Sequence, residues 1–98
     1  MPSFSMQVPH GLGRETARQR LQQFMDHVRS RNDVSDLEEN WVGDVLNFSF
    51  KTFGFKIEGA TTIEDDVVRM EGKLPIAAAP FRGRIEGQIE QELKRILS

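Results

Sequence analysis

The chain contains no cysteine, no tyrosine and no long run of apolar residues. Without cysteine it forms no disulfide, thiolate zinc site or cysteine nucleophile, which fits the reducing cytoplasm. No stretch of about 18 consecutive apolar residues occurs, so we expect no membrane-spanning helix. The amino-terminal sequence MPSFSMQVPHGLG lacks a basic start followed by an apolar run, and we expect no secretory signal. Together these absences predict a soluble, cytoplasmic protein.

The chain also lacks an excess of positive charge. Its 13 lysine and arginine residues are outnumbered by 15 aspartate and glutamate residues, which gives a net charge of −2. Nothing therefore attracts a phosphate backbone over long range, and we expect no nucleic-acid partner. The length of 98 residues accommodates one domain, residues 1–98, with few core side chains to spare for an enclosed cavity.

The spacing of apolar residues predicts two amphipathic helices. The first begins near Arg14, and its apolar residues recur at intervals of four, three and four: Ala17, Leu21, Phe24 and Val28. The second begins with Pro80, which suits the first position of a helix. Its apolar stripe continues to the end of the chain: Phe81, Ile85, Ile89, Leu93 and Ile96. Gly83 and Gly87 lie opposite this stripe, which indicates either a close contact on that side or a frayed first turn.

Five strands are predicted, and four of them share a register. The first strand alternates apolar Phe4, Met6 and Val8 with polar residues. Two-residue turns at 43–44, 53–54 and 65–66 then place one set of apolar residues on a common face. The predicted cross-strand neighbours are Trp41 with Leu46, Glu39 with Phe48, Leu37 with Phe50, Phe50 with Ile57, Phe48 with Gly59, Ile63 with Val68, Thr61 with Met70, Gly59 with Gly72, and Ile57 with Leu74.

The predicted element order is β-α-β-β-β-β-α. Because the sheet has one apolar face and each helix has one apolar stripe, we expect an α+β domain with two layers. In it, both helices pack on one face of an antiparallel sheet, and the first strand lies at an edge beside the second or the last strand. The other face is expected to be polar apart from Val42, Val45 and Val67. This valine group and an exposed strand edge leave a homodimer open.

No group of residues forms a catalytic or metal-binding pattern, so we expect neither an enzyme nor a bound cofactor or metal. His10 is the one titrating loop residue to consider, and a metal site there would need carboxylates as further ligands. The favoured alternative is that His10 caps or braces the turn before the first helix. His27 is expected to face solvent. Asp44 is expected to bond backbone amides in its turn.

The candidate contact residues are apolar. Phe48 lies in a predicted cross-strand row with Gly59 and Gly72, and we expect its ring to cover these glycines. Alternatively, the glycines form the floor of a ligand groove. The segment from Ile76 to Phe81 is expected to form an apolar lip at the edge of the sheet. The full candidate set for an apolar contact or groove is Phe48, Ile57, Gly59, Gly72, Ile76, Phe81 and Ile89.

Three segments in order carry a family resemblance: PHGLGRETARQRL (residues 9–21), WVGDVLNFSF (41–50) and APFRGRIEGQIEQEL (79–93). The matching features are His-x-Leu-Gly at 10–13, Ala17, Trp-x-Gly-Asp at 41–44, and Pro80-Phe81 followed by Ile85-Glu86. The chain resembles the polyhydroxyalkanoic acid system family of small bacterial proteins, also described as polyhydroxyalkanoate granule-region proteins. The resemblance implies a context near the polymer granule and supplies no catalytic residues.

Two functional hypotheses follow. In the first, the protein is a non-enzymatic accessory protein of polyhydroxyalkanoate storage that contacts the granule surface or a granule-associated protein. This hypothesis expects Ile76 and the valine face to be exposed and the interior to be closed. In the second, the protein binds a small apolar ligand such as an acyl chain between the sheet and the last helix. That hypothesis expects an open apolar cleft lined by Phe48, Ile57 and Ile89.

Overall fold

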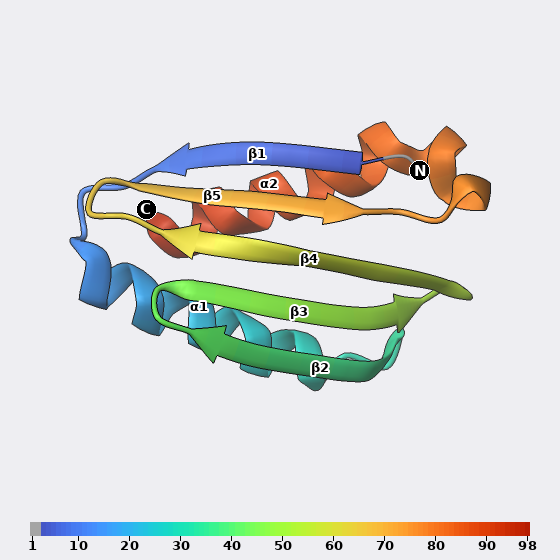
Figure 1. Cartoon of the computed structure of the whole chain (residues 1–98), viewed down its shortest axis with the longest axis horizontal. Helices are drawn as coiled ribbons and strands as arrows, with labels where there is room; N and C mark the ends of the chain where they lie inside the picture. Colours follow the sequence, from blue (N-terminus) through green and yellow to red (C-terminus); the bar gives the residue numbers. More distant parts are fainter. Residues whose placement is uncertain (1–2) are drawn as a thin grey trace.

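The computed structural model describes residues 3–98 and confirms the predicted order of elements (Figure 1). They are β1 (Ser3–Pro9), α1 (Arg14–Arg29), β2 (Val34–Val42), β3 (Val45–Thr52), β4 (Phe55–Ile63), β5 (Val67–Lys73), the short 3₁₀ helix η1 (Ile76–Phe81) and α2 (Arg82–Leu97). The five strands form one antiparallel sheet in the order β1-β5-β4-β3-β2. The first strand therefore lies at an edge beside the last strand, one of its two predicted positions.

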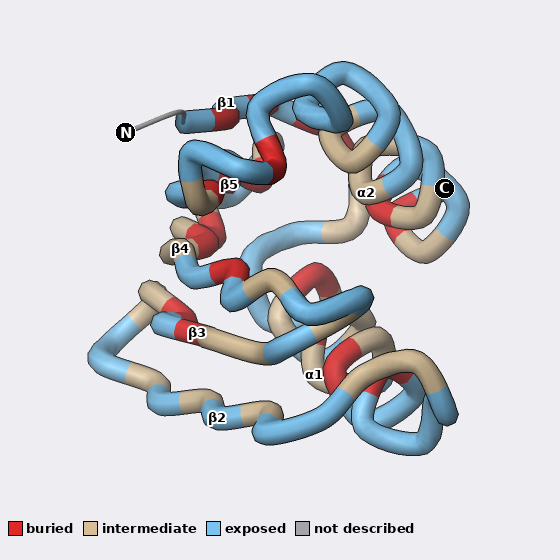
Figure 2. The backbone as a smooth tube through the Cα atoms, turned by 90° about the vertical axis from the view of Figure 1, so that its right-hand side faces the viewer, coloured by how far each residue is buried: buried red, intermediate tan, exposed pale blue. Residues whose placement is uncertain are grey.

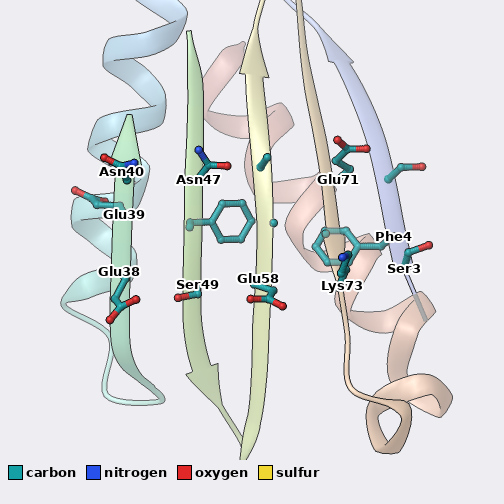
Figure 3. A pocket seen from close by; sticks show the side chains of 15 residues that line it. Ser3, Phe4, Glu38, Glu39, Asn40, Asn47, Ser49, Glu58, Glu71 and Lys73 are labelled. Atoms are coloured by element: carbon teal, nitrogen blue, oxygen red, sulfur yellow. The ribbon is translucent and has the colours of Figure 1, made fainter. Parts of the chain in front are cut away.

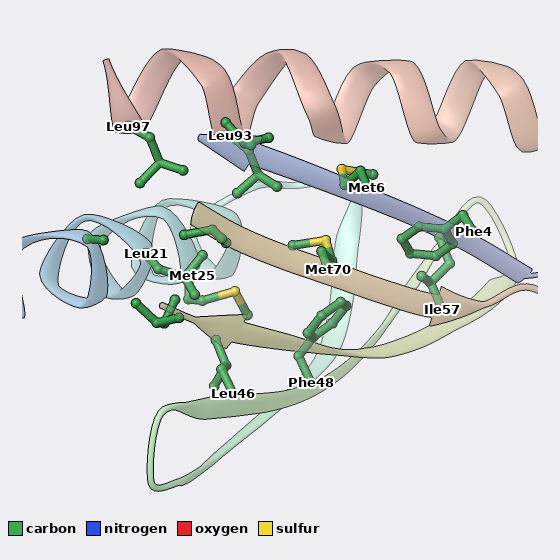
Figure 4. Close-up of a cluster of buried hydrophobic side chains, with 14 of the residues drawn as sticks. Phe4, Met6, Leu21, Met25, Leu46, Phe48, Ile57, Met70, Leu93 and Leu97 are labelled. Carbon is green, nitrogen blue, oxygen red and sulfur yellow. The ribbon is translucent and has the colours of Figure 1, made fainter. Parts of the chain in front are cut away.

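The sheet and the two helices form two layers, with both helices on the same face of the sheet (Figure 2). The helix α2 lies over β1, whereas α1 lies nearer β2 and β4. This arrangement confirms the α+β architecture expected from one apolar sheet face and two apolar helix stripes. The core between the layers is drawn in Figure 4 and includes Phe4, Leu21, Leu46, Phe48, Ile57, Met70, Leu93 and Leu97.

The three predicted turns and most of the predicted register are confirmed. Phe48 lies opposite Gly59, Thr61 opposite Met70, and Gly59 opposite Gly72, as the turn positions required. Leu37 does not form the one-to-one pair with Phe50 that was predicted, because the register of β2 shifts between Ser35 and Glu38. A β-bulge there sets two residues of β2 against one of β3, and its first residue, Asp36, has a φ of 54°.

The strand β5 ends one residue earlier than predicted. Lys73 is its last residue, so Leu74 forms no cross-strand pair with Ile57, although both are buried. Pro75 follows, and its carbonyl accepts the N–H of Ala78 at 2.9 Å to begin η1. Pro80 consequently lies inside the 3₁₀ helix and does not begin an α-helix, which corrects the predicted start of the last helix. The helix α2 begins at Arg82.

The row of glycines in β4 and β5 is covered by aromatic rings. A Cβ on Gly72 would lie 2.3 Å from Cζ of Phe4, and a Cβ on Gly59 would lie 3.0 Å from Cζ of Phe48. The Gly59 Cβ would also lie 2.3 Å from the carbonyl oxygen of Glu71, so the two strand backbones approach too closely for a side chain. The prediction that Phe48 covers both glycines is therefore confirmed for Gly59 only, because Phe4 covers Gly72.

His10 braces the turn before α1, as the favoured interpretation expected. The N–H of Leu12 donates to Nδ1 of His10 at 3.2 Å. Nδ1 is therefore the acceptor nitrogen, so Nε2 carries the proton and donates to the carbonyl of Glu64 at 3.1 Å. The ring is buried and links the β1–α1 loop to the β4–β5 turn.

Candidate functional site: an apolar end of the sheet

Exposed apolar side chains gather at one end of the molecule, where η1 and the β3–β4 turn lie. This end is on the right in Figure 1. Phe53 is 80% exposed, Ile76 is 74% exposed and Phe81 is 48% exposed. The rings of Phe55 and Phe81 have centroids 6.4 Å apart, which joins the turn to η1. We call Phe53, Phe55, Ile76 and Phe81 the apolar end.

Local anchoring explains why Ile76 points outward. Leu74 and Ala78, two residues before and after it, are both completely buried. The hydrogen bond from Ala78 to Pro75 closes the turn between these anchors. Ile76 is therefore held on the outside of a tight, fixed turn, as the apolar lip predicted from the sequence.

Phe53 has a left-handed backbone conformation, which glycine and asparagine adopt more readily than phenylalanine. Phe53 has a φ of 51° and the following Gly54 a φ of 79°. Two positive φ values identify a tight hairpin turn in which Asn, Asp or Gly is preferred at the first position. A bulky aromatic residue in this region is strained by about 1–3 kcal/mol. Because the ring is also exposed, neither local conformation nor core packing accounts for phenylalanine at this position.

Positive charge surrounds the apolar end. Lys51 and Lys56 lie directly opposite each other across β3 and β4, next to the turn, although like charges in this arrangement are unfavourable. Arg82 and Arg84 lie in the first turn of α2, where the helix dipole also disfavours cations. Two of these side chains have acidic partners: Lys51 lies 3.4 Å from the exposed Asp36, and Arg82 lies 3.7 Å from the half-buried Glu86.

The apolar end thus combines several features that local stability does not favour: a strained exposed aromatic residue, a lysine pair and cations at a helix start. Natural sequences depart from local rules mostly at functional sites. Phe53 and Phe55 are not among the predicted site residues, because the prediction of a turn at 53–54 assigned no contact to the aromatic side chains in and beside it. The signal in the sequence was phenylalanine, rather than asparagine or aspartate, before the turn glycine.

The open face of the sheet carries a different feature, a shallow polar hollow of about 1030 Å³ (Figure 3). It crosses the strands on the side opposite the helices. Its outward side chains form two cross-strand rows: Glu38, Ser49, Glu58, Lys73 and Ser3, and beside them Asn40, Asn47, Ala60, Glu71 and Ser5. This lining is unlike the apolar cleft expected for an acyl chain.

The predicted candidate residues separate into two groups. Phe48 and Ile57 are buried in the core, Gly59 and Gly72 are covered by rings, and Ile89 is a half-buried residue of α2. Ile76 and Phe81 are the two that reach the surface together with the missed Phe53. Val42 is 61% exposed at the opposite end of the sheet, while Val45 and Val67 are half-buried.

A second polar cluster joins α1 to the β2–β3 hairpin. The indole N–H of Trp41 donates to Oε1 of Gln22 at 2.8 Å, and Nε2 of Gln22 donates to Glu39 at 3.2 Å. Glu39 also lies 2.8 Å from Nη2 of Arg29, and this hydrogen bond raises the pKa of Arg29. The network connects α1 with the edge strand β2 next to two of the segments that carry the family resemblance.

Asp44 belongs to the same connection. Instead of bonding backbone amides as predicted, its carboxylate accepts from Nη1 of Arg14 at 2.8 Å and lies 3.7 Å from Nη1 of Arg18. Arg18 also donates to the carbonyl of Gly43 at 2.8 Å. Ion pairs and a hydrogen bond from Arg14 and Arg18 therefore join the first turns of α1 to the β2–β3 turn.

Within residues 3–98 the structure shows neither a metal-ligand cluster nor a helix that could span a membrane. In this range, no group of three or more His, Asp or Glu side chains is arranged to hold a metal ion. Neither α-helix of the described chain has the length and apolar character needed to cross a membrane.

Comparison with known proteins identifies a family. The family model described as "Putative polyhydroxyalkanoic acid system protein" matches residues 4–97, nearly the whole chain. A search of curated proteins finds no match to this sequence. The matched range contains every element of the fold except the first residue of β1, and it includes the apolar end and the cluster around Trp41.

Proposed function

Because the chain belongs to the polyhydroxyalkanoic acid system family, we propose that it is a non-enzymatic accessory protein of bacterial polyhydroxyalkanoate storage. In this proposal the protein is cytoplasmic and associates with the polymer granule. It contacts the granule surface directly through the apolar end.

The observation that carries the proposal is Phe53. Its side chain is 80% exposed on a backbone with positive φ, so the folded protein gains little from it in either conformation or burial. A contact with an apolar surface would bury the ring and offset the strain. Complete burial of a phenylalanine side chain stabilises a complex by about 1.5–3 kcal/mol.

The geometry of the apolar end supports contact with an extended surface. Phe53 and Ile76 project from two different turns, and the Phe55–Phe81 ring contact holds these turns together. Exposed side chains on two fixed turns can enter one surface at the same time without unfolding. The surrounding lysines and arginines keep long apolar stems near the same surface while their charged groups stay in water.

The proposal is tested by sedimentation with particles of the purified polymer. The test protein carries Phe53→Asn and Ile76→Ser, which remove apolar surface at the two most exposed positions of the end. The matched control is Val42→Ser, because Val42 is also exposed but lies in the hairpin at the opposite end of the sheet. Circular dichroism and a melting curve show that each variant is folded.

We expect the unaltered protein and the Val42 variant to sediment with the particles, and the double variant to remain in the supernatant. Equal sedimentation of all three proteins would contradict the role of the apolar end. If the unaltered protein stays in the supernatant with pure polymer but sediments with granules isolated from cells, the contact is with a granule-associated protein and direct surface binding is wrong.

A further inference from the structure

The two edges of the sheet differ in how well they are protected against pairing with another strand. Edge strands in natural proteins are usually interrupted by bulges or charged side chains. The edge strand β2 has both, a bulge at 35–38 and the acidic residues Asp36, Glu38 and Glu39. The edge strand β1, SFSMQVP, has no charged residue and pairs in regular register along its whole length. From this contrast we infer that β1 pairs with β1 of a second copy of the chain.

The hydrogen bonding of β1 shows which backbone groups are free. The N–H of His10 donates to the carbonyl of Asp66, which continues the β1–β5 register by one residue. In an antiparallel pair, alternate residues direct both backbone groups to the same neighbour. Phe4, Met6 and Val8 therefore bond to β5, while the backbone groups of Ser3, Ser5 and Gln7 point away from the sheet. Pro9 also lies in the outward set, so its missing N–H costs no bond to β5, although it can donate none to a second copy.

These outward groups are complementary to themselves about a two-fold axis at Met6. Such an axis places Ser5 of each copy opposite Gln7 of the other, and Ser3 opposite Pro9. Every outward N–H of Ser3, Ser5 and Gln7 then meets a carbonyl of the second copy. The apolar side chains of both β1 strands remain on the same face, so the two sheets join into one with all helices on one side.

The helix above β1 leaves room for this pairing. Arg20 of α1 donates to the carbonyl of Ile96, so the flank of α2 at Ile96 faces α1. Gly83 and Gly87 lie on the opposite flank, toward the free edge of β1, and open space surrounds both glycines. Glu90 and Lys94 lie near this flank with opposite charges, so the facing α2 helices need not repel each other.

A second copy fits this edge better than a peptide from another protein. Peptides that add a strand are selected by pockets for their alternate side chains. Here Phe4 and Val8 are each only 2% exposed and α2 covers the strand, so the apolar side of the edge offers no such pocket. In the resulting dimer the apolar ends lie at opposite ends of the joined sheet, and the pairing does not depend on the proposed granule contact.

The inference is tested by sedimentation equilibrium and amide hydrogen exchange across a micromolar concentration series. We expect the mass to double with concentration, and the amides of Ser5 and Gln7 to become protected in parallel. Ser5→Pro removes an outward N–H without removing a bond to β5, and it is expected to remain monomeric with its secondary structure intact. Ser5→Thr keeps the N–H and is expected to dimerise.

Three results would overturn the inference. The first is a monomeric mass at every concentration. The second is a dimer in which the amides of Ser5 and Gln7 exchange as freely as in the monomer, because another surface would then form the contact. The third is a folded Ser5→Pro variant that dimerises as well as Ser5→Thr. The exchange measurement needs no substitution and so applies even if Ser5→Pro fails to fold.

Discussion

The guanidinium carbon of Arg18 lies 4.2 Å from the centroid of the Trp41 ring, so a residue of α1 covers an aromatic residue of β2. The same side chain bonds the carbonyl of Gly43 and lies near Asp44. This contact joins two segments of the family pattern that are far apart in the sequence. The Arg18–Trp41 contact is partly exposed, and a cation–π contact of this kind contributes about 0.5–1 kcal/mol to the stability of the fold.

Arg18→Ala is expected to lower the free energy of unfolding by about 1 kcal/mol, which corresponds to a fall of about 4–8 °C in melting temperature for a domain of this size. Trp41 is the one tryptophan of the chain, so its fluorescence reports the contact directly. We expect its emission to move to longer wavelength as water replaces the guanidinium. Arg84→Ala, on the exposed side of α2, is the control and should leave the emission unchanged.

Arg31 and Asp33 form an ion pair within the loop that connects α1 to β2, and this pair predicts a pH effect on stability. Nε and Nη2 of Arg31 donate to the two carboxylate oxygens of Asp33 at 3.0 and 2.9 Å. These bonds lower the pKa of Asp33 from its ordinary value of 3.8. A carboxyl group with a lowered pKa in the folded state contributes stability above its unfolded-state pKa, and this contribution disappears as the pH falls through the folded-state pKa.

Arg31→Gln is therefore expected to return the pKa of Asp33 toward 3.8, and to weaken the loss of stability on acidification below about pH 4. The pKa is measured by following the Asp33 carboxyl carbon by NMR during an acid titration. Lys94→Gln removes a cation from an unrelated ion pair with Glu90 and serves as the control. An unchanged titration midpoint in Arg31→Gln would show that the pair does not persist in solution.

Phe53→Asn is expected to stabilise the isolated protein by about 1 kcal/mol, because asparagine adopts positive φ more readily than phenylalanine. The same substitution is expected to weaken granule binding, so stability and function should change in opposite directions. Urea unfolding measures the first effect. Phe53→Leu removes the ring but keeps a bulky residue on the strained backbone, and it should give no gain. A loss of stability in Phe53→Asn would mean that the ring contributes to the fold itself.

The register of the sheet could be predicted because side chains in a strand alternate with a period of two. The turns at Gly43, Gly54 and Asp65 each had to place apolar residues on one face, and a shift by one residue would have reversed them. The bulge at Asp36 could not be predicted in this way. Its extra residue changes the alternation in the middle of β2, and the sequence contains no glycine there to indicate it.

The candidate site could be predicted only in part, since it is assembled from two turns that are distant in the sequence. Ile76 and Phe81 were identified from the proline-bounded segment that carries them. Phe53 was not, because its predicted place in the turn at 53–54 does not show which other exposed side chains lie beside it in the folded chain. The contact of Phe55 with Phe81, which joins the turns, depends on the tertiary fold.

Thr61 gives a prediction about the core. It is completely buried, and its Oγ1 atom has no hydrogen-bond partner. A buried hydroxyl without a partner costs about 1–3 kcal/mol. Thr61→Val replaces it with a methyl group of similar size and is expected to raise the urea midpoint without changing the m-value. Thr62→Val, on the other face of the same strand, is the control and should change stability little. A destabilised Thr61→Val variant would indicate that the hydroxyl is bonded in solution.

Substitution by alanine should change stability in opposite directions at Gly72 and Gly87, because Gly72 is closely packed and Gly87 is open. In Gly72→Ala the new Cβ would lie 2.3 Å from the ring of Phe4 and 2.8 Å from the carbonyl oxygen of Glu58. The ring can move, but the strand backbone of Glu58 cannot, so we expect a loss of about 3 kcal/mol or more. In Gly87→Ala, at an open position of α2, we expect a gain of about 0.5–1 kcal/mol from helix propensity.

Adding Phe4→Leu to Gly72→Ala separates the two contacts at Gly72. The smaller side chain gives the new methyl group room on the ring side, so the double variant should lose less stability than the sum of the single variants. The loss in free energy of unfolding that remains in the double variant measures the collision of the new methyl group with the β4 backbone. Full additivity in urea unfolding would show that Phe4 does not cover Gly72, and the reason for glycine in this row would then lie in the strand backbones alone.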